Sequence, residues 1–214
     1  MLWQKTFFEA FWRLFLCLYF TGLIGIWFSP WTSFFISLTP LLILLTFLAG
    51  IAIDTPDRLS LGRLFICGVL GFLAEVAGVQ KGWIFGDYSY GTVLGPSLWG
   101  VPIILIINWM WVLYGASVLQ RWLGISNKAN PFVTAAILII YDFFLESFAI
   151  RFGLWQWKER KVPGENFVGW GIVSLLLASI WQPNNQIQNN LGARLFILQF
   201  LFFIVSYFIK KILE

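Results

Sequence analysis

The stretch FVTAAILIIYDFFLESFAIRFGLW, residues 132–155, decides the fold class because it is long, apolar and interrupted by two carboxylates. A helix needs about 20 mostly apolar residues to cross a bilayer, and this run exceeds that length. A charge at the centre of such a helix costs at least about 2.5–3.5 kcal/mol, so it normally faces other helices and has a partner or a task. The stretch therefore predicts a membrane-embedded helix that carries Asp142 and Glu146 towards a protein interior.

The composition of the whole chain agrees with this reading. Of 214 residues, 59% are apolar and 11% are charged, and none is histidine. Soluble domains have about 45–50% apolar and about 25% charged residues, so we predict an all-α, multi-pass integral membrane protein. The missing histidine excludes Ser-His-Asp and Cys-His catalysis, His-ligated metals and imidazole proton shuttles.

Other classes of site lack their signatures too. Cys17 and Cys67 are too few for a thiolate cluster or a disulfide framework. The sequence contains no phosphate-binding glycine loop, no dinucleotide fingerprint and no DxxxD cluster for a diphosphate-bound metal. The net charge of +4 does not indicate nucleic-acid binding. We therefore expect no metal, no cofactor and no nucleic-acid partner.

Apolar runs of spanning length predict seven helices in one compact domain over residues 1–214. They cover residues 7–28, 34–53, 64–79, 99–122, 132–155, 168–181 and 195–209, of which the third and sixth are short. An odd number of spans places the two termini on opposite sides of the membrane. Between the second and third spans, DTPDR at residues 54–58 predicts a polar turn in which Asp54 or Asp57 caps a helix.

A weak internal repeat relates the third and fourth spans to the fifth and sixth. With an offset of 71 residues, four features align: Phe72 with Phe143, Glu75 with Glu146, Gly82 with Gly153, and Trp99-Gly100 with Trp170-Gly171. Such an offset predicts a helical hairpin repeated in the same orientation, with both glutamates at equivalent depth. The alternative is chance similarity between two apolar hairpins.

Three carboxylates lie within predicted spans: Glu75, Asp142 and Glu146. The spacing of four puts Asp142 and Glu146 on one helix face. Carboxyls held close together away from water repel each other when ionised, so at least one is expected to stay protonated, as a general acid must be. The alternative is a structural role, in which they bind Arg151, Asn108 or backbone groups.

Aromatic residues gather near these acids. The segment GWIFGDYSYG at residues 82–91 and its counterpart GLWQW at residues 153–157 mix glycines with aromatic rings. Tyr and Trp are common at membrane interfaces, so an aromatic belt is one interpretation. The other is a slot for a flat apolar ligand, whose rings could stabilise a cation. Asn108, in the fourth span, could orient a water molecule or form an interhelical hydrogen bond.

Several motifs in order resemble the CruF-type carotenoid biosynthesis proteins, over about residues 64–175. They are GFLAE (71–75), FGDYSY (85–90), GVP (100–102), NW (108–109), DFFLE (142–146), GLWQW (153–157) and VPGENFVGW (162–170). Ser147 and the charged loop at 158–161 depart from the family pattern. The family includes carotenoid 1,2-hydratases of the γ-carotene and bisanhydrobacterioruberin type, and the membrane-bound lycopene cyclases are more distantly similar.

The resemblance implies addition of water to the terminal C1=C2 double bond of an acyclic or monocyclic carotenoid, through protonation and capture of a tertiary carbocation. Glu146 or Glu75 is then expected to donate the proton, while Asp142 holds the water. The substrate-binding residues expected around them are Trp83, Phe85, Asp87, Tyr88, Tyr90, Asn108, Trp155, Trp157, Asn166 and Trp170. The implied partners are the carotenoid, water as co-substrate, membrane lipid and other carotenoid enzymes, and the implied location is a prokaryotic cell membrane.

Two alternative functions remain open at this point. A carotenoid end-group cyclase would use the same protonation, but an internal double bond would capture the cation in place of water. A small transporter or a pigment-binding membrane protein would use the buried acids for proton relay or for packing, without catalysis.

Overall fold

The computed structural model describes residues 2–54, 56–125, 130–181 and 190–214. These residues are mostly helical, which confirms the all-α class. The helices are α1 (Leu2–Phe28), α2 (Thr32–Ser37), α3 (Thr39–Asp54), α4 (Arg58–Lys81), α5 (Leu105–Trp122), α6 (Pro131–Arg151), α7 (Gly164–Ile180) and α8 (Leu191–Leu213). Four short strands join them: β1 (Tyr88–Tyr90), β2 (Ser97–Leu98), β3 (Val101–Pro102) and β4 (Trp155–Trp157).

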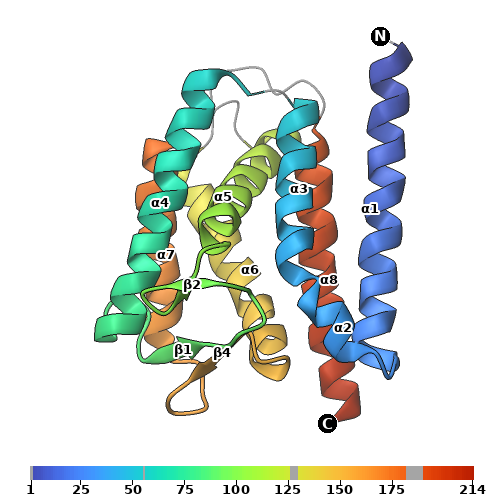
Figure 1. Ribbon diagram of the computed structural model, residues 1–214. Helices are drawn as coiled ribbons and strands as arrows, with labels where there is room; N and C mark the ends of the chain where they lie inside the picture. Colours follow the sequence, from blue (N-terminus) through green and yellow to red (C-terminus); the bar gives the residue numbers. More distant parts are fainter. Residues whose placement is uncertain (1, 55, 126–129, 182–189) are drawn as a thin grey trace.

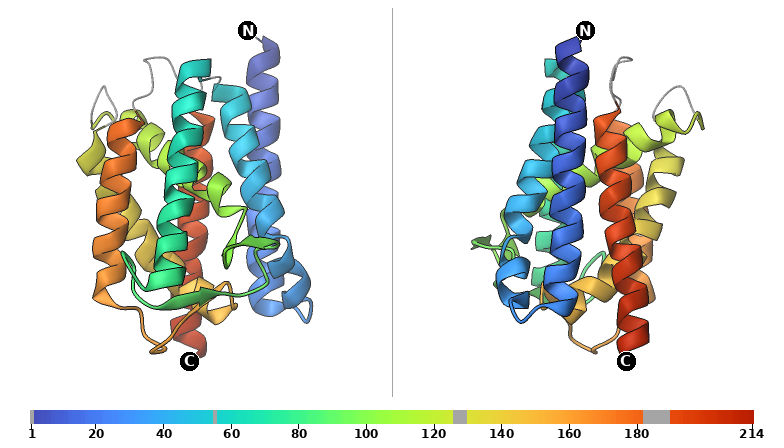
Figure 2. Two further views of the ribbon diagram at one scale, coloured as in Figure 1. Left: turned by 60° about the vertical axis from the view of Figure 1, so that its left-hand side comes forward. Right: turned by 90° about the vertical axis from the view of Figure 1, so that its right-hand side faces the viewer.

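The long helices run side by side in alternating directions, and the N- and C-termini lie at opposite ends of the bundle (Figures 1 and 2). Four helices of the described residues are long and apolar enough to cross a membrane: α1 from Phe7, α4, α6 and α8. α3 and α7 are apolar but shorter. The membrane character is thus confirmed, and the number of seven spans stays a prediction.

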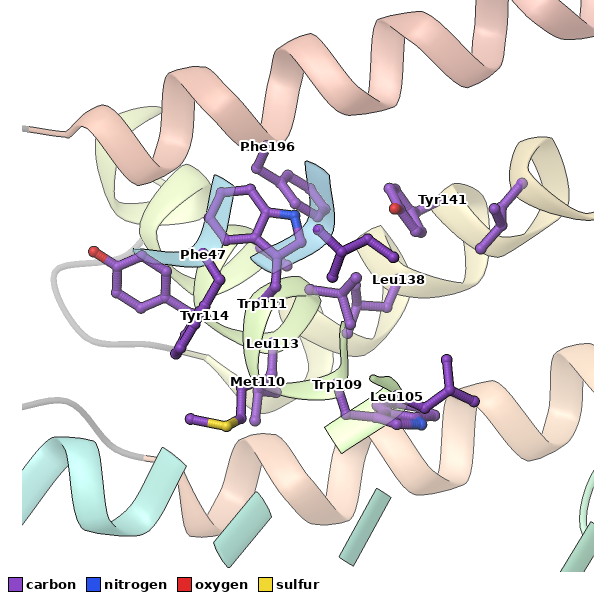
Figure 3. Close-up of a cluster of buried hydrophobic side chains, with 14 of the residues drawn as sticks. Phe47, Leu105, Trp109, Met110, Trp111, Leu113, Tyr114, Leu138, Tyr141 and Phe196 are labelled. Atoms are coloured by element: carbon purple, nitrogen blue, oxygen red, sulfur yellow. The ribbon is translucent and has the colours of Figure 1, made fainter. Parts of the chain in front are cut away.

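α5 is the central helix of the bundle. It contacts α3, α4, α6, α7 and α8, and every residue from Trp109 to Gln120 is buried. Figure 3 shows its side chains packed among residues of α3, α6 and α8, including Phe47, Leu138, Tyr141 and Phe196. A helix surrounded in this way must be apolar on all faces, which explains why its sequence has no polar stripe.

The ends of α4 and α6 follow local sequence signals. The Asp57 side chain accepts a hydrogen bond from the backbone N–H of Ser60 at 2.9 Å and caps α4, as one of the two sequence alternatives predicted. Gly82, at φ +67°, ends α4 in the left-handed conformation that glycine adopts without steric cost. Asn130 caps α6, and Pro131 occupies its first turn, where proline is favoured.

Asp54 is also a helix cap, although of a distant helix. This buried carboxyl accepts the backbone N–H groups of Leu191 and Gly192 at 3.0 and 2.9 Å, at the start of α8. Its Oδ2 also accepts the hydroxyl of Tyr114 from α5 at 2.6 Å. Asp54 therefore joins the end of α3 to α5 and α8.

Three predicted span boundaries are wrong. The fourth span was expected from Trp99, but α5 begins at Leu105 because residues 97–102 form the β2–β3 hairpin. The fifth was expected to run to Trp155, which instead lies in β4 and pairs with β1. The second span is divided into α2 and α3, with Pro40 in the first turn of α3, where its missing N–H costs no helical hydrogen bond.

The predicted repeat falls on the hairpins α4–α5 and α6–α7, but one of its four aligned features does not match in structure: Trp99-Gly100 lies between β2 and β3, whereas Trp170-Gly171 lies inside α7. α4 and α6 run in the same direction, and each is followed by a strand at the same end of the bundle (Figure 1). These strands, β1 and β4, pair antiparallel, with Tyr88 opposite Trp157 and Tyr90 opposite Trp155. The two halves of the repeat therefore meet at the strand pair.

Candidate functional site

A cavity of about 220 Å³ is lined by both halves of the repeat and by residues of α1, α2, α3 and α8. Glu75 from α4 and Glu146 from α6 both line it. Eight of the other residues predicted from the sequence also line it: Phe85, Tyr88, Tyr90, Asn108, Trp155, Trp157, Asn166 and Trp170. Two carboxyls from different helices thus face one mainly apolar space that is rich in aromatic rings.

Glu75 accepts hydrogen bonds on both of its carboxyl oxygens. Its Oε2 accepts the hydroxyls of Tyr88 and, at 2.8 Å, of Tyr90. Its Oε1 accepts the indole N–H of Trp109, in α5, at 3.1 Å. The carboxyl is only 5% exposed, so these three donors replace the hydration that an ionised carboxylate would have in water.

Glu146 has a different set of donors. Its Oε2 accepts the indole N–H groups of Trp155 and Trp157 at 3.1 and 2.9 Å. Its Oε1 accepts a hydrogen bond from the side-chain Nδ2 of Asn166, in α7, at 3.3 Å. Two donors occupy both lone-pair sites of Oε2, whereas Oε1 accepts one hydrogen bond, so Oε1 is the oxygen with room to carry a hydrogen.

Asp142 lies behind Glu146 and does not line the cavity. Its Oδ2 accepts the Nδ2 of Asn166 at 2.6 Å, while its Oδ1 has no hydrogen-bond partner among the described residues. Asn166 therefore connects the two acids of α6 through one amide group. Arg151 was one expected partner if these acids had a purely structural role. It pairs instead with Glu214, at 3.5 Å between Nη1 and Oε1.

The β1–β4 pair positions four of the five aromatic donors. Side chains two residues apart in a strand point to the same face, so Tyr88 and Tyr90 reach Glu75 together, and Trp155 and Trp157 reach Glu146 together. Tyr88 lies 5.1 Å from Trp157, and Tyr90 lies 5.9 Å from Trp155, between ring centroids. The two aromatic segments therefore form one wall of the cavity, where β1 pairs with β4.

Trp109 is a site residue that the sequence reasoning missed. It donates to Glu75 and stacks on Trp170, with ring centroids 4.6 Å apart. Gly71 makes room for it, because a Cβ built at Gly71 would lie 2.4 Å from the Trp109 ring. The glycine four residues before Glu75 was the available signal, since residues with that spacing share a helix face.

Two expected site residues lie outside the cavity. Trp83 is 65% exposed, and Asp87 forms a surface ion pair with Lys158, at 3.0 Å between Oδ2 and Nζ. Both belong to the connection between α4 and β1, whose turn directs Phe85 inward and these two side chains outward. Neither contributes to the aromatic wall.

The chain matches the family model of the carotenoid biosynthesis proteins over residues 35–212. It belongs to the carotenoid biosynthesis protein family. All residues of the cavity named above fall within the match. The carotenoid biosynthesis protein described here is also 32% identical to bisanhydrobacterioruberin hydratase of Haloarcula japonica, in an alignment of 114 residues covering 48% of this chain and 39% of that relative. The alignment thus spans about two fifths of the relative's length. No solved structure matches the chain.

Proposed function

We propose that this protein is a membrane-embedded carotenoid hydratase, which adds water to the terminal C1=C2 double bond of a carotenoid end. The observation that carries the proposal is the pair Glu75 and Glu146, which face one aromatic cavity from opposite halves of the repeat. Membership of the carotenoid biosynthesis family supports a carotenoid substrate, and the hydratase among its relatives supports this reaction class.

Glu146 is the proposed proton donor. Glu146 is buried, and none of the salt bridges among the described residues involves it, which favours a neutral carboxyl because an unpaired charge in an apolar site is costly. With Oε2 accepting from Trp155 and Trp157, the acidic hydrogen belongs on Oε1. Transfer of this proton to C2 of the substrate breaks the double bond and leaves a tertiary carbocation at C1. The faces of the surrounding rings stabilise the cation.

Glu75 is the proposed partner of the water molecule. Its two tyrosine hydroxyls can donate and accept, so Tyr88 and Tyr90 can orient a water molecule beside the carboxylate. The water oxygen bonds to C1, and its excess proton passes to Glu75. One water is added overall, no electrons are transferred, and proton exchange with solvent restores both carboxyls.

Asp142 acts through Asn166 in this scheme. We assign it a positioning role, because it lies outside the cavity lining and so cannot hold the attacking water as the sequence reasoning expected. Its hydrogen bond to Asn166 fixes the amide that also faces Glu146 Oε1.

The test is expression in cells that accumulate an acyclic carotenoid, followed by mass analysis of the pigments. Hydration raises the mass of the product by one water molecule for each end that reacts. The double variant Glu75→Gln with Glu146→Gln, produced at the same level in the membrane, is the matched control and should leave the pigment unchanged. An isomer of unchanged mass would instead identify a cyclase, and an unaltered pigment with the unmodified protein would contradict both enzymatic readings.

A further inference from the structure

The cavity extends beyond the acids, towards the outside of the bundle between α1 and α3. Its lining there includes Leu18 and Gly22 of α1, and Leu41, Leu42 and Leu45 of α3. Leu18, Leu41 and Leu45 are 38%, 50% and 41% exposed, so the lining reaches the surface that faces lipid. The space around the acids therefore has a side opening with apolar walls.

Two contacts between α1 and its neighbours bound this opening. On one side, Tyr19 of α1 hydrogen-bonds Thr46 of α3, with 3.4 Å between the hydroxyl oxygens. On the other, Gly25 of α1 packs against Phe35 of α2, so closely that a Cβ at Gly25 would lie 2.4 Å from the ring. Six residues separate Tyr19 from Gly25 along α1, a rise of about 9 Å.

Gly22 lies between these two contacts and leaves the opening free. A Cβ built at Gly22 would meet no atom within 4 Å, in contrast to the crowded Gly25. Gly22 also lines the cavity and shares a helix face with Tyr19 and Ile26, which line it too. The glycine therefore keeps α1 narrow at the level of the opening.

The volume of the cavity indicates how much of a carotenoid it can enclose. Pockets that enclose a drug-sized ligand have about 300–1,000 Å³, so a cavity of about 220 Å³ encloses only part of a carotenoid. A conjugated polyene is rigid and extended, so it cannot fold up behind its reacting end. Its remaining length must leave the cavity, and an apolar chain gains most by leaving into lipid.

We propose that the opening at Gly22, between α1 and α3, is the lateral passage in which the polyene chain of the bound carotenoid lies. The reacting end is then held between Glu75 and Glu146, while the far end stays in the bilayer. The proposal rests on the proposed function for the identity of the ligand, and it assigns a binding role to α1, which precedes the matched family range.

The test measures retained pigment and does not depend on turnover. The Glu146→Gln protein is purified from cells that accumulate an acyclic carotenoid, and the pigment bound per protein is quantified by absorbance. Adding Gly22→Trp should lower this ratio at least about tenfold, because the indole fills the passage. Gly62→Trp is the matched control, since Gly62 is also a helical glycine with nothing within 4 Å of its Cβ position but lies outside the cavity lining.

Leu42→Trp, at the opposite wall, provides a second variant and should give the same loss. Each protein is first compared by its unfolding temperature, so that misfolding is not taken for blockage. Pigment retained equally with Gly22→Trp and Leu42→Trp would overturn the proposal, as would a membrane lipid occupying the passage in place of pigment. The proposed function fails separately: if the unmodified protein binds pigment but adds no water, the passage stands and the hydratase does not.

Discussion

The two halves of the repeat hold equivalent glutamates in different surroundings. Glu75 follows Gly71 by four residues, and the space above the glycine is filled by Trp109, which donates to Glu75. Glu146 follows Asp142 by four residues, and there the side chain of the aspartate binds the amide of Asn166. The same helical spacing thus carries an aromatic donor in one half and a second acid in the other.

The strand residues differ in a parallel way. Glu75 is bound by two tyrosine hydroxyls, which can both donate and accept hydrogen bonds, and Glu146 by two indole N–H groups, which can only donate. An approximately symmetric frame can in this way hold two carboxyls with unequal tasks. Substitutions at the two glutamates should therefore have unequal effects on the reaction.

The largest effect is expected for Glu146→Gln. Removing the proton donor should lower the hydration rate by about 10²–10⁴-fold, the usual contribution of a general acid. The measurement is the initial rate of hydrated pigment formation in membranes with matched protein amounts. Pigment binding should persist because glutamine keeps the shape and an accepting oxygen for the indoles.

Glu75→Gln should lower the same rate by a smaller factor, since solvent water can still take up the proton released when the attacking water bonds to C1. Both variants are compared in one membrane preparation. A greater loss for Glu75→Gln than for Glu146→Gln would reverse the two assigned roles, while equal and complete retention of activity would remove both residues from the mechanism.

Asp142→Asn should have a still smaller effect on rate and a distinct effect on its pH dependence. Asparagine can continue to accept from Asn166, so the fold and the bound pigment should be preserved. Loss of an ionisable group coupled to Glu146 should alter the pH–rate profile. An unchanged profile together with an unchanged rate would show that Asp142 only packs the helix.

Gly71→Ala tests the close approach that distinguishes the Glu75 half. The added methyl would press on the Trp109 ring, and such overpacking costs about 1–3 kcal/mol. Gly62→Ala on the same helix is the control, because its Cβ position is open. Thermal unfolding in detergent should show a lower midpoint for Gly71→Ala and no loss for Gly62→Ala; equal midpoints would contradict the tight contact.

The smallest effect concerns the helix caps of the two halves. Hydrogen bonds from the side chain and backbone of Ser60 lower the pKa of Asp57, which caps α4, whereas α6 is capped by the uncharged Asn130. A lowered pKa in the folded state means that this stabilisation is present above the unfolded pKa of about 3.9 and is lost as the pH falls through the folded value.

Acidification through that range should therefore lower the unfolding temperature of the unmodified protein slightly more than that of Asp57→Asn. Asparagine is also a good N-cap, so the two proteins should unfold alike near neutral pH. An identical response to acid would show that the Asp57 cap contributes no pH-dependent stability.

The positions of the helices were largely predictable, because hydrophobic length is a local property of the chain. The errors occur where non-local pairing takes over: Trp155 belongs by composition to the apolar run of α6, but in the fold it pairs with Tyr90. The sequence did contain a local signal for the division of the second span, namely Pro40, but the apolar residues on both sides of it made the segment look continuous. Trp83 and Asp87 could not be separated from Phe85 by sequence, because the turn that directs them outward depends on its packing.

The sequence by itself determined an apolar, helical protein in which Glu75, Asp142 and Glu146 are exceptional, since charges in apolar runs require a reason wherever the helices lie. Only the tertiary structure decided that two of these acids share a cavity while Asp142 lies behind Asn166. It also decided that β1 and β4 supply four of the donors and that Gly22 lies at a side opening. These features arise from contacts between segments far apart in the chain, which no local pattern of residues encodes.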